Sequence, residues 1–559
     1  MIPFPVQEAC CMENGSISAI DSAIVVAYLL GIMVVGILAG YRKNTSSDQF
    51  FLAGRSFRWP LIGAGLFVAN ISTIHFVGLA SSGYKDGLVI GNFEWMASFC
   101  LILLGIVFAP FYFRSRITTL PEYVEKRYGT GARTILAFIF VMSALLVHIG
   151  ISLYAGAKVI EELFGIPSLV SIVVIAVVTA IYTILGGLKA VMITDGIQAV
   201  LLLLGAAILT FAGIQSLPGA GIDSWADLRA ACRPDQLSMI QPIKDAAAPG
   251  SLGLREFSWY SILFGYPVLG IWYWCTDQTI VQKVLAAKTE KDGRDGAIFA
   301  GFLKILPVFL MVLPGVIGYV LFREKIGNNN DATLMVMMKE LLPTGVRGLM
   351  AAGLLAALMS TVQAALNSTA TLTAEDIVKR LRPDTSDAAL VKIGRISAAV
   401  VVVLAIFWST QGGKFGSIFE AINKIPMAFA PGITTIFLWG VFWRRGNKQG
   451  AMAALLFNVV IGLVYLMIDI PLIGTEQIIA KRLGIPFMQV GWYLFLMSSA
   501  VYVAVSLMTP PPAEKQLNNL CWTRPLDALR GKIEGPLTDP RIMATILLVV
   551  MGILYALLH

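Results

Sequence analysis

Long apolar segments separated by short polar ones dominate the chain. A transmembrane helix needs about 20 predominantly apolar residues to cross a hydrocarbon layer about 30 Å thick. Fourteen segments meet this requirement, and we predict that each forms one membrane-spanning helix. They lie near residues 21–41, 58–83, 93–113, 133–163, 168–187, 191–213, 255–282, 295–322, 345–378, 391–409, 415–443, 448–468, 488–508 and 541–558. The pattern therefore predicts an all-α polytopic membrane protein with 14 transmembrane helices.

Lys and Arg residues cluster in every second loop between these segments. Because cytoplasmic loops are enriched in Lys and Arg, the clusters define the inner side of the membrane. They lie at 42–58, 114–133, 283–294, 379–395 and 444–448, and in the loop 509–540. This alternation agrees with fourteen crossings and predicts that both termini are external or periplasmic. The external tail 1–20 contains no Lys or Arg and so lacks the basic region of a cleavable signal.

Two of the apolar segments are interrupted by polar residues. The interruptions are LFVANISTIHFVG at 66–78 and GIWYWCTDQ at 270–278. Each interrupted segment opens a run of five predicted spans, 58–213 and 255–443. Because five is odd, the second run begins on the opposite side of the membrane. Paired interruptions in such inverted repeats are typical of a binding site near the membrane midplane.

The remaining segments are expected to lie around these two repeats. Accessory helices are predicted at 21–41, 448–508 and 541–558. The polar loop 214–254, rich in Gly and Pro, lies on the outer side. It forms either a small cap over an outer mouth or a solvated linker, and the sequence leaves both interpretations open.

Composition narrows the class of protein. Of 559 residues, 57% are hydrophobic and 14% are charged, and the mean hydropathy is +0.77. Soluble domains carry about 25% charged residues, so a soluble enzyme and a disordered chain are excluded. The net charge of +8 is spread between apolar runs rather than over one polar face, and no nucleic-acid partner is expected. Six cysteines without a C-x-x-C motif and three histidines predict neither a disulfide framework nor a zinc site.

Glu94 and Lys304 fall inside predicted spans, where a charge is costly and normally faces a partner or an aqueous cavity. Glu94 lies just inside the span 93–113. It either faces such a cavity or is an interfacial residue at the positive end of the helix dipole. Lys304 is deeper, in the span 295–322. We expect a neutralising partner or a polar ligand beside it, and snorkelling to the inner face is the alternative.

Polar residues crowd the first interruption. His75 follows Asn70, Ser72 and Thr73 within one broken segment. An isolated histidine is more often a packing residue, but these neighbours favour a ligand-binding role for His75. His148, in the middle of the span 133–163, has no such neighbours, and we predict a packing role for it.

Ser360 and Thr361 are adjacent hydroxyl residues deep in a long apolar helix. Such hydroxyls often donate to the carbonyl group four residues earlier. They also suit a cation site, because an unwound helix exposes carbonyl oxygens and Na⁺ takes oxygen ligands. A monovalent ion requires no carboxylate. The sequence leaves two interpretations open for this pair: back-bonding within its own helix, or a Na⁺ site formed together with the interruption around Ser72.

Two further groups have both a structural and a functional interpretation. Asp195 opens the predicted span 191–213 on the inner side, either as a helix cap or within an inner ion path. Trp272, Tyr273 and Trp274 are consecutive aromatic residues beside the second interruption. They fit an interfacial aromatic belt, but aromatic rings also stack against the flat apolar faces of sugars.

Five motifs make the sequence specific to one family. They are DQFFLAGRS at 48–56, ANIS at 69–72, GGLKAVMITD at 186–195, WYWCTDQ at 272–278 and LNSTAT at 366–371. The chain resembles the sodium/glucose cotransporters of the solute:sodium symporter family from about residue 20 to 470, and more loosely beyond. The resemblance implies a LeuT-type core of two inverted five-helix repeats. It also implies Na⁺-driven sugar uptake by alternating access.

The resemblance also implies roles for individual residues. The Na⁺ site would use the backbone carbonyls of Val68, Ile71 and Ala357 and the hydroxyls of Ser360 and Thr361. The sugar would contact Asn70, His75, Glu94 and Lys304, with Tyr273 stacking as an inner gate beside Trp274.

Two places depart from the family pattern. Where sugar carriers often have Gln, this chain has Asn423, whose shorter amide changes the reach to a solute hydroxyl. Relatives with a second Na⁺ site have hydroxyls one turn beyond the Ser-Thr pair, where Gln363 and Ala364 lie here. We therefore expect one Na⁺ per sugar, with Asp195 as the candidate second ion path.

These observations predict a Na⁺-coupled symporter that imports a glucose- or galactose-like hexose. We expect a monomer embedded in the bilayer of the plasma (inner) membrane, and no enzyme activity. One alternative is a Na⁺ symporter for inositol, sialic acid or another organic acid, although Glu94 argues against an anionic solute. The other alternative is a symporter-like nutrient sensor, which usually carries a cytoplasmic signalling domain. The loop 509–540 is too short for such a domain.

Overall fold

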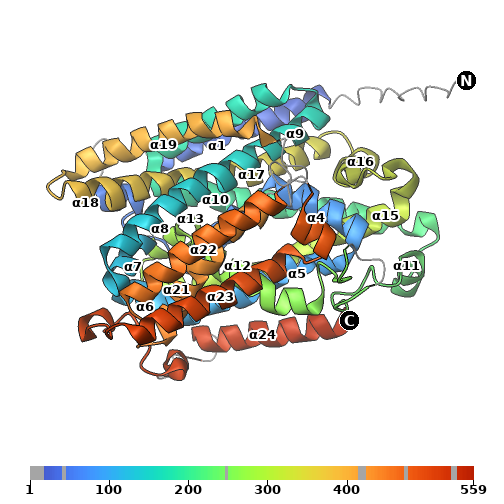
Figure 1. The fold of residues 1–559 in the computed structure, drawn as a ribbon. Helices are drawn as coiled ribbons and strands as arrows, with labels where there is room; N and C mark the ends of the chain where they lie inside the picture. The colour runs from blue at the N-terminus through green and yellow to red at the C-terminus, as the bar shows by residue number, and fades with distance from the viewer. Residues whose placement is uncertain are drawn as a thin grey trace, which may run out of the picture.

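The structure is a computed structural model. It describes residues 18–40, 46–245, 250–412, 423–470, 476–530, 535 and 538–559. Over these residues the regular structure is helical, and the only strand-like pairings are two isolated bridges, Phe57 with Ala287 and Lys244 with Leu254. The long helices run between the same two ends of the molecule (Figure 1). The prediction of an all-α protein is confirmed.

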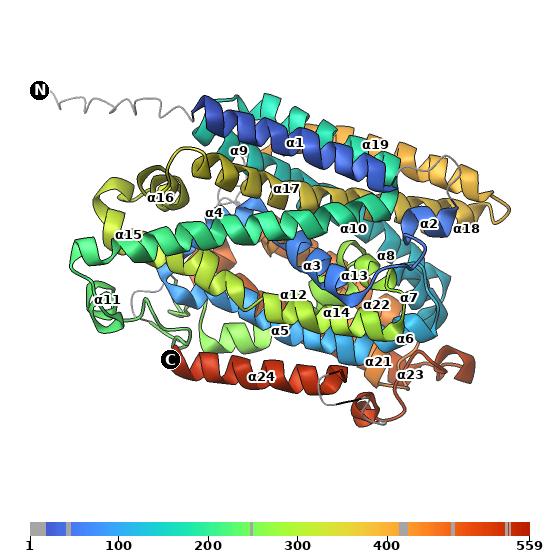
Figure 2. The same ribbon diagram turned by 180° about the vertical axis from the view of Figure 1, so that it is seen from behind.

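Seven α-helices of the described chain have 18 residues or more. They are α1 (Ala19–Gly40), α10 (Ser168–Ser216), α17 (Val346–Thr371), α19 (Asp387–Ser409), α22 (Lys448–Asp469), α23 (Phe487–Met508) and α24 (Pro540–Leu557). α17 is central: 94% of the most apolar 18-residue stretch of its span is buried, compared with 22% of the corresponding stretches of α1 and α24. α1 and α19 lie along one edge of the molecule and α24 along the opposite edge (Figure 2). α1 and α24 therefore expose apolar surface, as lipid-facing helices do.

Other apolar stretches are divided into consecutive pieces, several of which are π-helical. The pieces are α5 (Asn92–Leu103), η2 (Leu104–Phe108) and α6 (Ala109–Arg114); α8 (Thr130–Ser143), η3 (Ala144–Ile151) and α9 (Ser152–Phe164); α14 (Glu290–Leu303), η7 (Val308–Val312) and α15 (Leu313–Ile326); and η9 (Leu372–Val378) with α18 (Lys379–Leu381) after α17. The shorter α21 (Ala430–Phe442) follows η11 (Ile425–Ala428).

Within the described residues, ten helices are long and apolar enough to cross a membrane, or eleven if one bent pair counts as a span. The sequence predicts fourteen, and the difference has local causes. α10 includes two predicted spans, joined at Gly187, whose φ of 58° and ψ of −157° kink the helix. The predicted span 255–282 is divided into short pieces, and the span 415–443 lies partly outside the described residues. The count of fourteen stays a prediction.

Short elements cover the two ends of the molecule. α11 (Trp225–Ala231) and α16 (Thr333–Leu341) lie at one end, the α11 end, and α2 (Ser47–Phe51), α7 (Leu120–Tyr128) and α18 lie at the opposite end, the α7 end (Figure 2). The remaining short helices of the described residues include η4 (Pro218–Ala220), η8 (Asn330–Ala332), η12 (Ile478–Leu483), η13 (Glu514–Gln516) and η14 (Pro525–Leu529). The start of α1 and the end of α24 both lie at the α11 end (Figure 2).

The described part of the loop 214–254, which contains α11, packs against η1 (Leu88–Gly91) and the end of α24. The N–H of Leu88, in η1, donates to the Gln236 carbonyl at 2.8 Å, and the Met239 N–H donates to the Leu558 carbonyl at 2.8 Å. A Cβ at Gly87 would lie 2.2 Å from the Gln236 carbonyl oxygen, so the loop and the protein body touch closely. The described part of this loop is therefore packed rather than freely solvated, and its role as a cap over an outer mouth stays a prediction.

The first interruption divides α3 (Trp59–Asn70) from α4 (Thr73–Asp86), with a bend of 62° between the two axes. Ile71 and Ser72 are extended, and Ser72 caps α4. α17 braces both sides of the break. Thr361 Oγ1 donates to the Ala69 carbonyl at 3.2 Å, and Thr73 Oγ1 donates to the Leu354 carbonyl at 2.8 Å.

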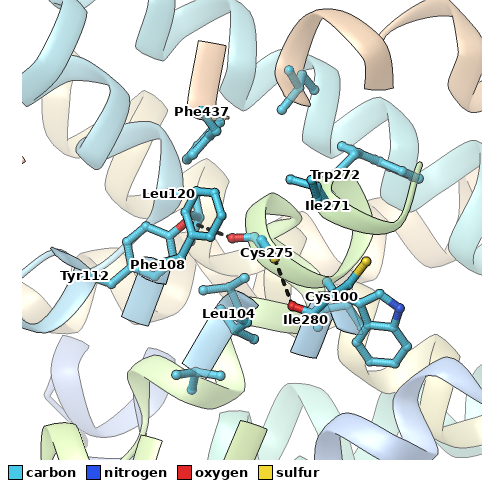
Figure 3. Close-up of a cluster of buried hydrophobic side chains, with 14 of the residues drawn as sticks. Cys100, Leu104, Phe108, Tyr112, Leu120, Ile271, Trp272, Cys275, Ile280 and Phe437 are labelled. Carbon is cyan, nitrogen blue, oxygen red and sulfur yellow. Dashed lines mark hydrogen bonds between the residues drawn. The ribbon is translucent and has the colours of Figure 1, made fainter. Parts of the chain in front are cut away.

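The second interruption follows η5 (Ser261–Gly265), α12 (Tyr266–Gly270) and η6 (Ile271–Thr276), and α13 (Gln278–Leu285) begins after it. Asp277 is extended and caps α13 through the Thr279 N–H at 2.7 Å. Figure 3 shows how the end of η6 is held: the Tyr112 hydroxyl donates to the Cys275 carbonyl, and the Cys275 thiol donates to the Cys100 carbonyl. The Tyr112 hydroxyl thus satisfies a carbonyl that the broken helix leaves unpaired, and the Cys275 thiol ties the end of η6 to α5.

Candidate functional site

One cavity of about 120 Å³ lies beside both interruptions. Six of the seven predicted solute-binding residues line it: Asn70, His75, Glu94, Tyr273, Trp274 and Asn423. The seventh, Lys304, lies behind them with its ammonium group against the side chains of Asn70 and Glu94. The fold therefore brings the predicted residues together, and solute binding by them stays a prediction.

The polar part of this cavity is a buried ion pair. Lys304 Nζ lies 2.5 Å from Glu94 Oε2, and the two residues are 0% and 2% exposed. The ammonium also contacts Asn70 Oδ1 and lies 5.2 Å from the ring centroid of Trp274. Lys304 therefore does not snorkel, and Glu94 is not an interfacial residue. Because an unpaired buried charge costs several kcal/mol, each side chain fixes the other.

Three consecutive aromatic residues of η6 line the cavity, together with Phe93 of α5 and Tyr266 of α12. The three are Trp272, Tyr273 and Trp274, and Trp272 and Trp274 are buried. The rings of Tyr273 and Trp274 meet edge to face, with centroids 5.1 Å apart. The interpretation as an exposed interfacial belt is wrong, because these rings lie inside the protein. They offer a rigid apolar surface to a bound ring.

His75 shapes the first interruption. Its Nδ1 accepts a hydrogen bond from the Ser72 N–H at 3.2 Å and lies 3.0 Å from Ser72 Oγ. These contacts complete a capping box at the start of α4. The helix start thus uses Nδ1, and Nε2 is the nitrogen available to a solute.

The predicted sodium residues converge only in part. Thr361 Oγ1 lies 3.2 Å from the Ala69 carbonyl oxygen and 3.3 Å from that of Ala357. Val68 and Ile71 lie in and directly after the last turn of α3, whose carbonyl groups lack intrahelical donors. Oxygen atoms from α3 and α17 therefore gather at the break, as a Na⁺ site requires. The Ala69 carbonyl, which the sequence did not indicate, lies in the same group of oxygen atoms, and the Na⁺ site stays a prediction.

Ser360 points to a different partner. Its hydroxyl donates to Asp195 Oδ1 at 2.6 Å. Asp195 is fully buried in the interior of α10, so the capping hypothesis for this residue is wrong. Lys283 forms an ion pair with Asp195, and Gln363 Nε2 donates to Asp195 Oδ1 at 2.6 Å. One polar network thus links α10, α13 and α17.

Two residues of this region were missed or misplaced from the sequence. Lys283 was assigned to a cytoplasmic loop, but it is 1% exposed within α13. His148 was expected to be a packing residue, yet it lines the same cavity as Glu94.

Comparison with known proteins places these features in a family. A model of the sodium:solute symporter family matches residues 50–458. Sodium/glucose cotransporter 4 of Danio rerio is 34% identical over 560 residues, covering 94% of this chain and 84% of the relative. Sodium/myo-inositol cotransporter 2 of Bos taurus is 34% identical over 557 residues, covering 94% of this chain and 82% of the relative.

Two solved structures share the fold. A Na⁺-coupled sialic acid symporter in a substrate-bound outward-open state aligns with a TM-score of 0.71 at 20% identity, covering 88% of this chain and 99% of that one. The nucleobase-cation-symport-1 family transporter MHP1 aligns with a TM-score of 0.52 at 16% identity, covering 85% and 98%. This chain therefore shares the helical fold of these two proteins.

Proposed function

The chain belongs to the sodium:solute symporter family and is a Na⁺-coupled transporter rather than an enzyme, and we propose that it imports a neutral hexose of the glucose or galactose type. One observation carries the choice of solute. Among the described residues that line the cavity, Glu94 alone has a full formal charge, and Lys304 already neutralises it. An acid such as sialic acid would need a cation that Lys304 cannot supply while it is paired. A neutral solute needs hydroxyl partners and an apolar surface, both of which line this cavity.

A second candidate solute is myo-inositol. It is also a neutral ring with several hydroxyl groups, so the same amides, imidazoles and aromatic rings suit it. Relatives named for glucose and for myo-inositol are equally similar to this chain. A nutrient sensor of the same fold would bind the solute without moving it, and the uptake experiment below separates the two.

Sodium would bind where α3 and α17 meet. The Ala69 and Ala357 carbonyls and the Thr361 hydroxyl already lie together there, and the Val68 and Ile71 carbonyls complete the proposed set. The Ser360 hydroxyl joins this set by turning away from Asp195. A bound ion holds the end of α3, and Asn70 is the last residue of that helix. Sodium binding thereby orders a solute-contacting side chain, which is positive coupling between two sites.

One Na⁺ per solute is sufficient for strong accumulation. One charge crossing 100 mV contributes about 2.3 kcal/mol. A tenfold Na⁺ gradient adds about 1.4 kcal/mol. Together these support a solute gradient of roughly several hundredfold by the same relation. Gln363 fills the region where relatives have further hydroxyls, which supports a single ion, and Asp195 is paired with Lys283.

The proposal extends to the arrangement in the membrane. We assign fourteen crossings, with inverted repeats at 58–213 and 255–443, each opened by one of the two breaks. The helices at 21–41, 448–508 and 541–558 are accessory. Both termini lie outside the plasma membrane, the loop 509–540 lies in the cytoplasm, and the monomer is the working unit. Labelling of single introduced cysteines from either side of the membrane tests these assignments.

Uptake into proteoliposomes tests the proposed function. Labelled glucose and myo-inositol are offered with an inward Na⁺ gradient, and with a K⁺ gradient of equal size as the control. Accumulation of glucose that requires the Na⁺ gradient is expected. Accumulation of myo-inositol alone would replace the hexose assignment by the second candidate. Solute binding without any gradient-driven uptake would favour a sensor.

A further inference from the structure

His148 lies in a π-helical segment on the cavity wall. The segment is η3, Ala144–Ile151, and His148 is 5% exposed. π-Helical turns inside helices are frequent at functional sites, because they redirect a side chain at a cost in backbone geometry. His148 lines the same cavity as Asn70 and Glu94.

Asp277 holds one nitrogen of the imidazole. His148 Nε2 lies 3.4 Å from Asp277 Oδ2, and both side chains are buried. Asp277 is itself fixed, since its Oδ1 accepts the N–H of Thr279 at the start of α13. A carboxylate only accepts hydrogen bonds, so Nε2 carries the hydrogen in the neutral ring. Nδ1 is then an acceptor, and within the described residues it has no hydrogen-bond partner.

Aromatic neighbours fix the plane of the ring. The imidazole stacks on Trp272 with centroids 6.5 Å apart and an interplanar angle of 27°, and its centroid lies 5.8 Å from that of Tyr273. Both aromatic residues line the cavity. The imidazole thus belongs to the wall that would contact a bound ring, with one nitrogen anchored and the other unused.

We propose that His148 is a solute-binding residue whose Nδ1 accepts a hydrogen bond from one hydroxyl of the sugar or polyol, and that Asp277 positions it for this contact. The inference rests on the proposed function and adds to it a residue that selects one hydroxyl. A site that hydrogen-bonds a particular hydroxyl discriminates against the analogue that lacks it, because a buried acceptor is then left unpaired.

A series of single-hydroxyl deletions tests this contact. Binding of glucose, of myo-inositol and of their monodeoxy analogues is measured in Na⁺ for the wild-type protein and for His148→Phe. In the wild type, the analogue that lacks the hydroxyl bonded to His148 should bind about 3- to 10-fold more weakly than its parent, because this hydrogen bond is missing. In His148→Phe the parent should weaken by a similar factor, and that analogue should bind as well as the parent. His148→Asn, whose Oδ1 can replace Nδ1, should keep the discrimination.

Val147→Ala is the matched control, because Val147 lines the same cavity without a polar group. It should change the affinity of every analogue alike. The inference is overturned if His148→Phe also weakens the parent and all analogues by one common factor, or leaves every affinity unchanged. If the wild-type protein takes up neither glucose nor myo-inositol in response to Na⁺, the proposed function fails first, and this inference fails with it.

Discussion

Replacing Glu94 by Gln removes a charge from the cavity wall while keeping its shape. The two side chains are almost equal in size, so the main change is the loss of the anion that faces Lys304. The Lys304 ammonium stays fully buried, and its other neighbours are the Asn70 amide oxygen and the rings of Trp274 and Phe67. The ring contacts exist in the wild type as well, and therefore do not offset the loss.

The size of the effect follows from burial. Removing one partner of a buried ion pair costs about 3–5 kcal/mol. The resulting fall in Tm equals this loss of free energy divided by the entropy of unfolding, which grows with chain length. For a chain of 559 residues the fall is about 3–4 °C. Solute binding should be lost, because Glu94 is one of the proposed sugar contacts and its charge also positions the Lys304 ammonium beside Asn70. Sodium binding should remain, because within the described residues none of the proposed Na⁺ ligands is hydrogen-bonded to Glu94.

A double variant separates charge from shape. Glu94→Gln combined with Lys304→Met has no unpaired charge, so its Tm should return to within about 1 °C of the wild type. Saturable glucose binding should stay absent from it. The assay is thermal unfolding of the purified protein, with labelled-glucose binding on the same samples. A single variant as stable as the wild type, or a double variant no more stable than the single one, would refute the reasoning.

Three further changes test other parts of the structure. Thr361→Ala should raise the Na⁺ concentration for half-maximal uptake about tenfold by removing one oxygen ligand; an unchanged value removes Thr361 from the site. Lys283→Met leaves the buried Asp195 carboxylate without its cationic partner and should lower Tm by several degrees. Lys283→Arg keeps the positive charge and should retain most of the stability. An equal fall in Tm in both variants would contradict a charge effect. Gly83→Ala places a Cβ 2.3 Å from the Val312 carbonyl oxygen and should lower the free energy of unfolding by about 1–3 kcal/mol, measured by thermal unfolding. Gly31→Ala is the control, because the space around Gly31 is open, and it should cause no such loss. Equal Tm values for the two variants would refute the clash.

Helices formed by one uninterrupted apolar run were predictable from the sequence. The predicted segments 21–41 and 541–558 agree with α1 and α24 to within two residues at each end. The π-helical pieces were not predictable, because they depend on tertiary contacts rather than on local periodicity. The hydrogen bond from Tyr112 to the Cys275 carbonyl, for example, joins residues from distant spans.

The site was partly predictable for a related reason. A buried charge in a membrane helix requires a partner, so Lys304 was expected to have one, but only the fold identifies Glu94 as that partner. The same rule failed for Lys283, since a lysine near the end of a predicted span resembles a loop residue. His148 resembled a packing residue because its neighbours on the cavity wall lie elsewhere in the sequence.

The central claim is that Na⁺ at the interrupted helix and the solute in the adjacent cavity bind cooperatively. Equilibrium binding of labelled glucose to the purified protein, in Na⁺ and in K⁺ at equal ionic strength, tests it most directly. We predict that Na⁺ tightens glucose binding about 5- to 150-fold, and that glucose tightens Na⁺ binding by the same factor. Equal glucose affinity in the two salts would contradict the account.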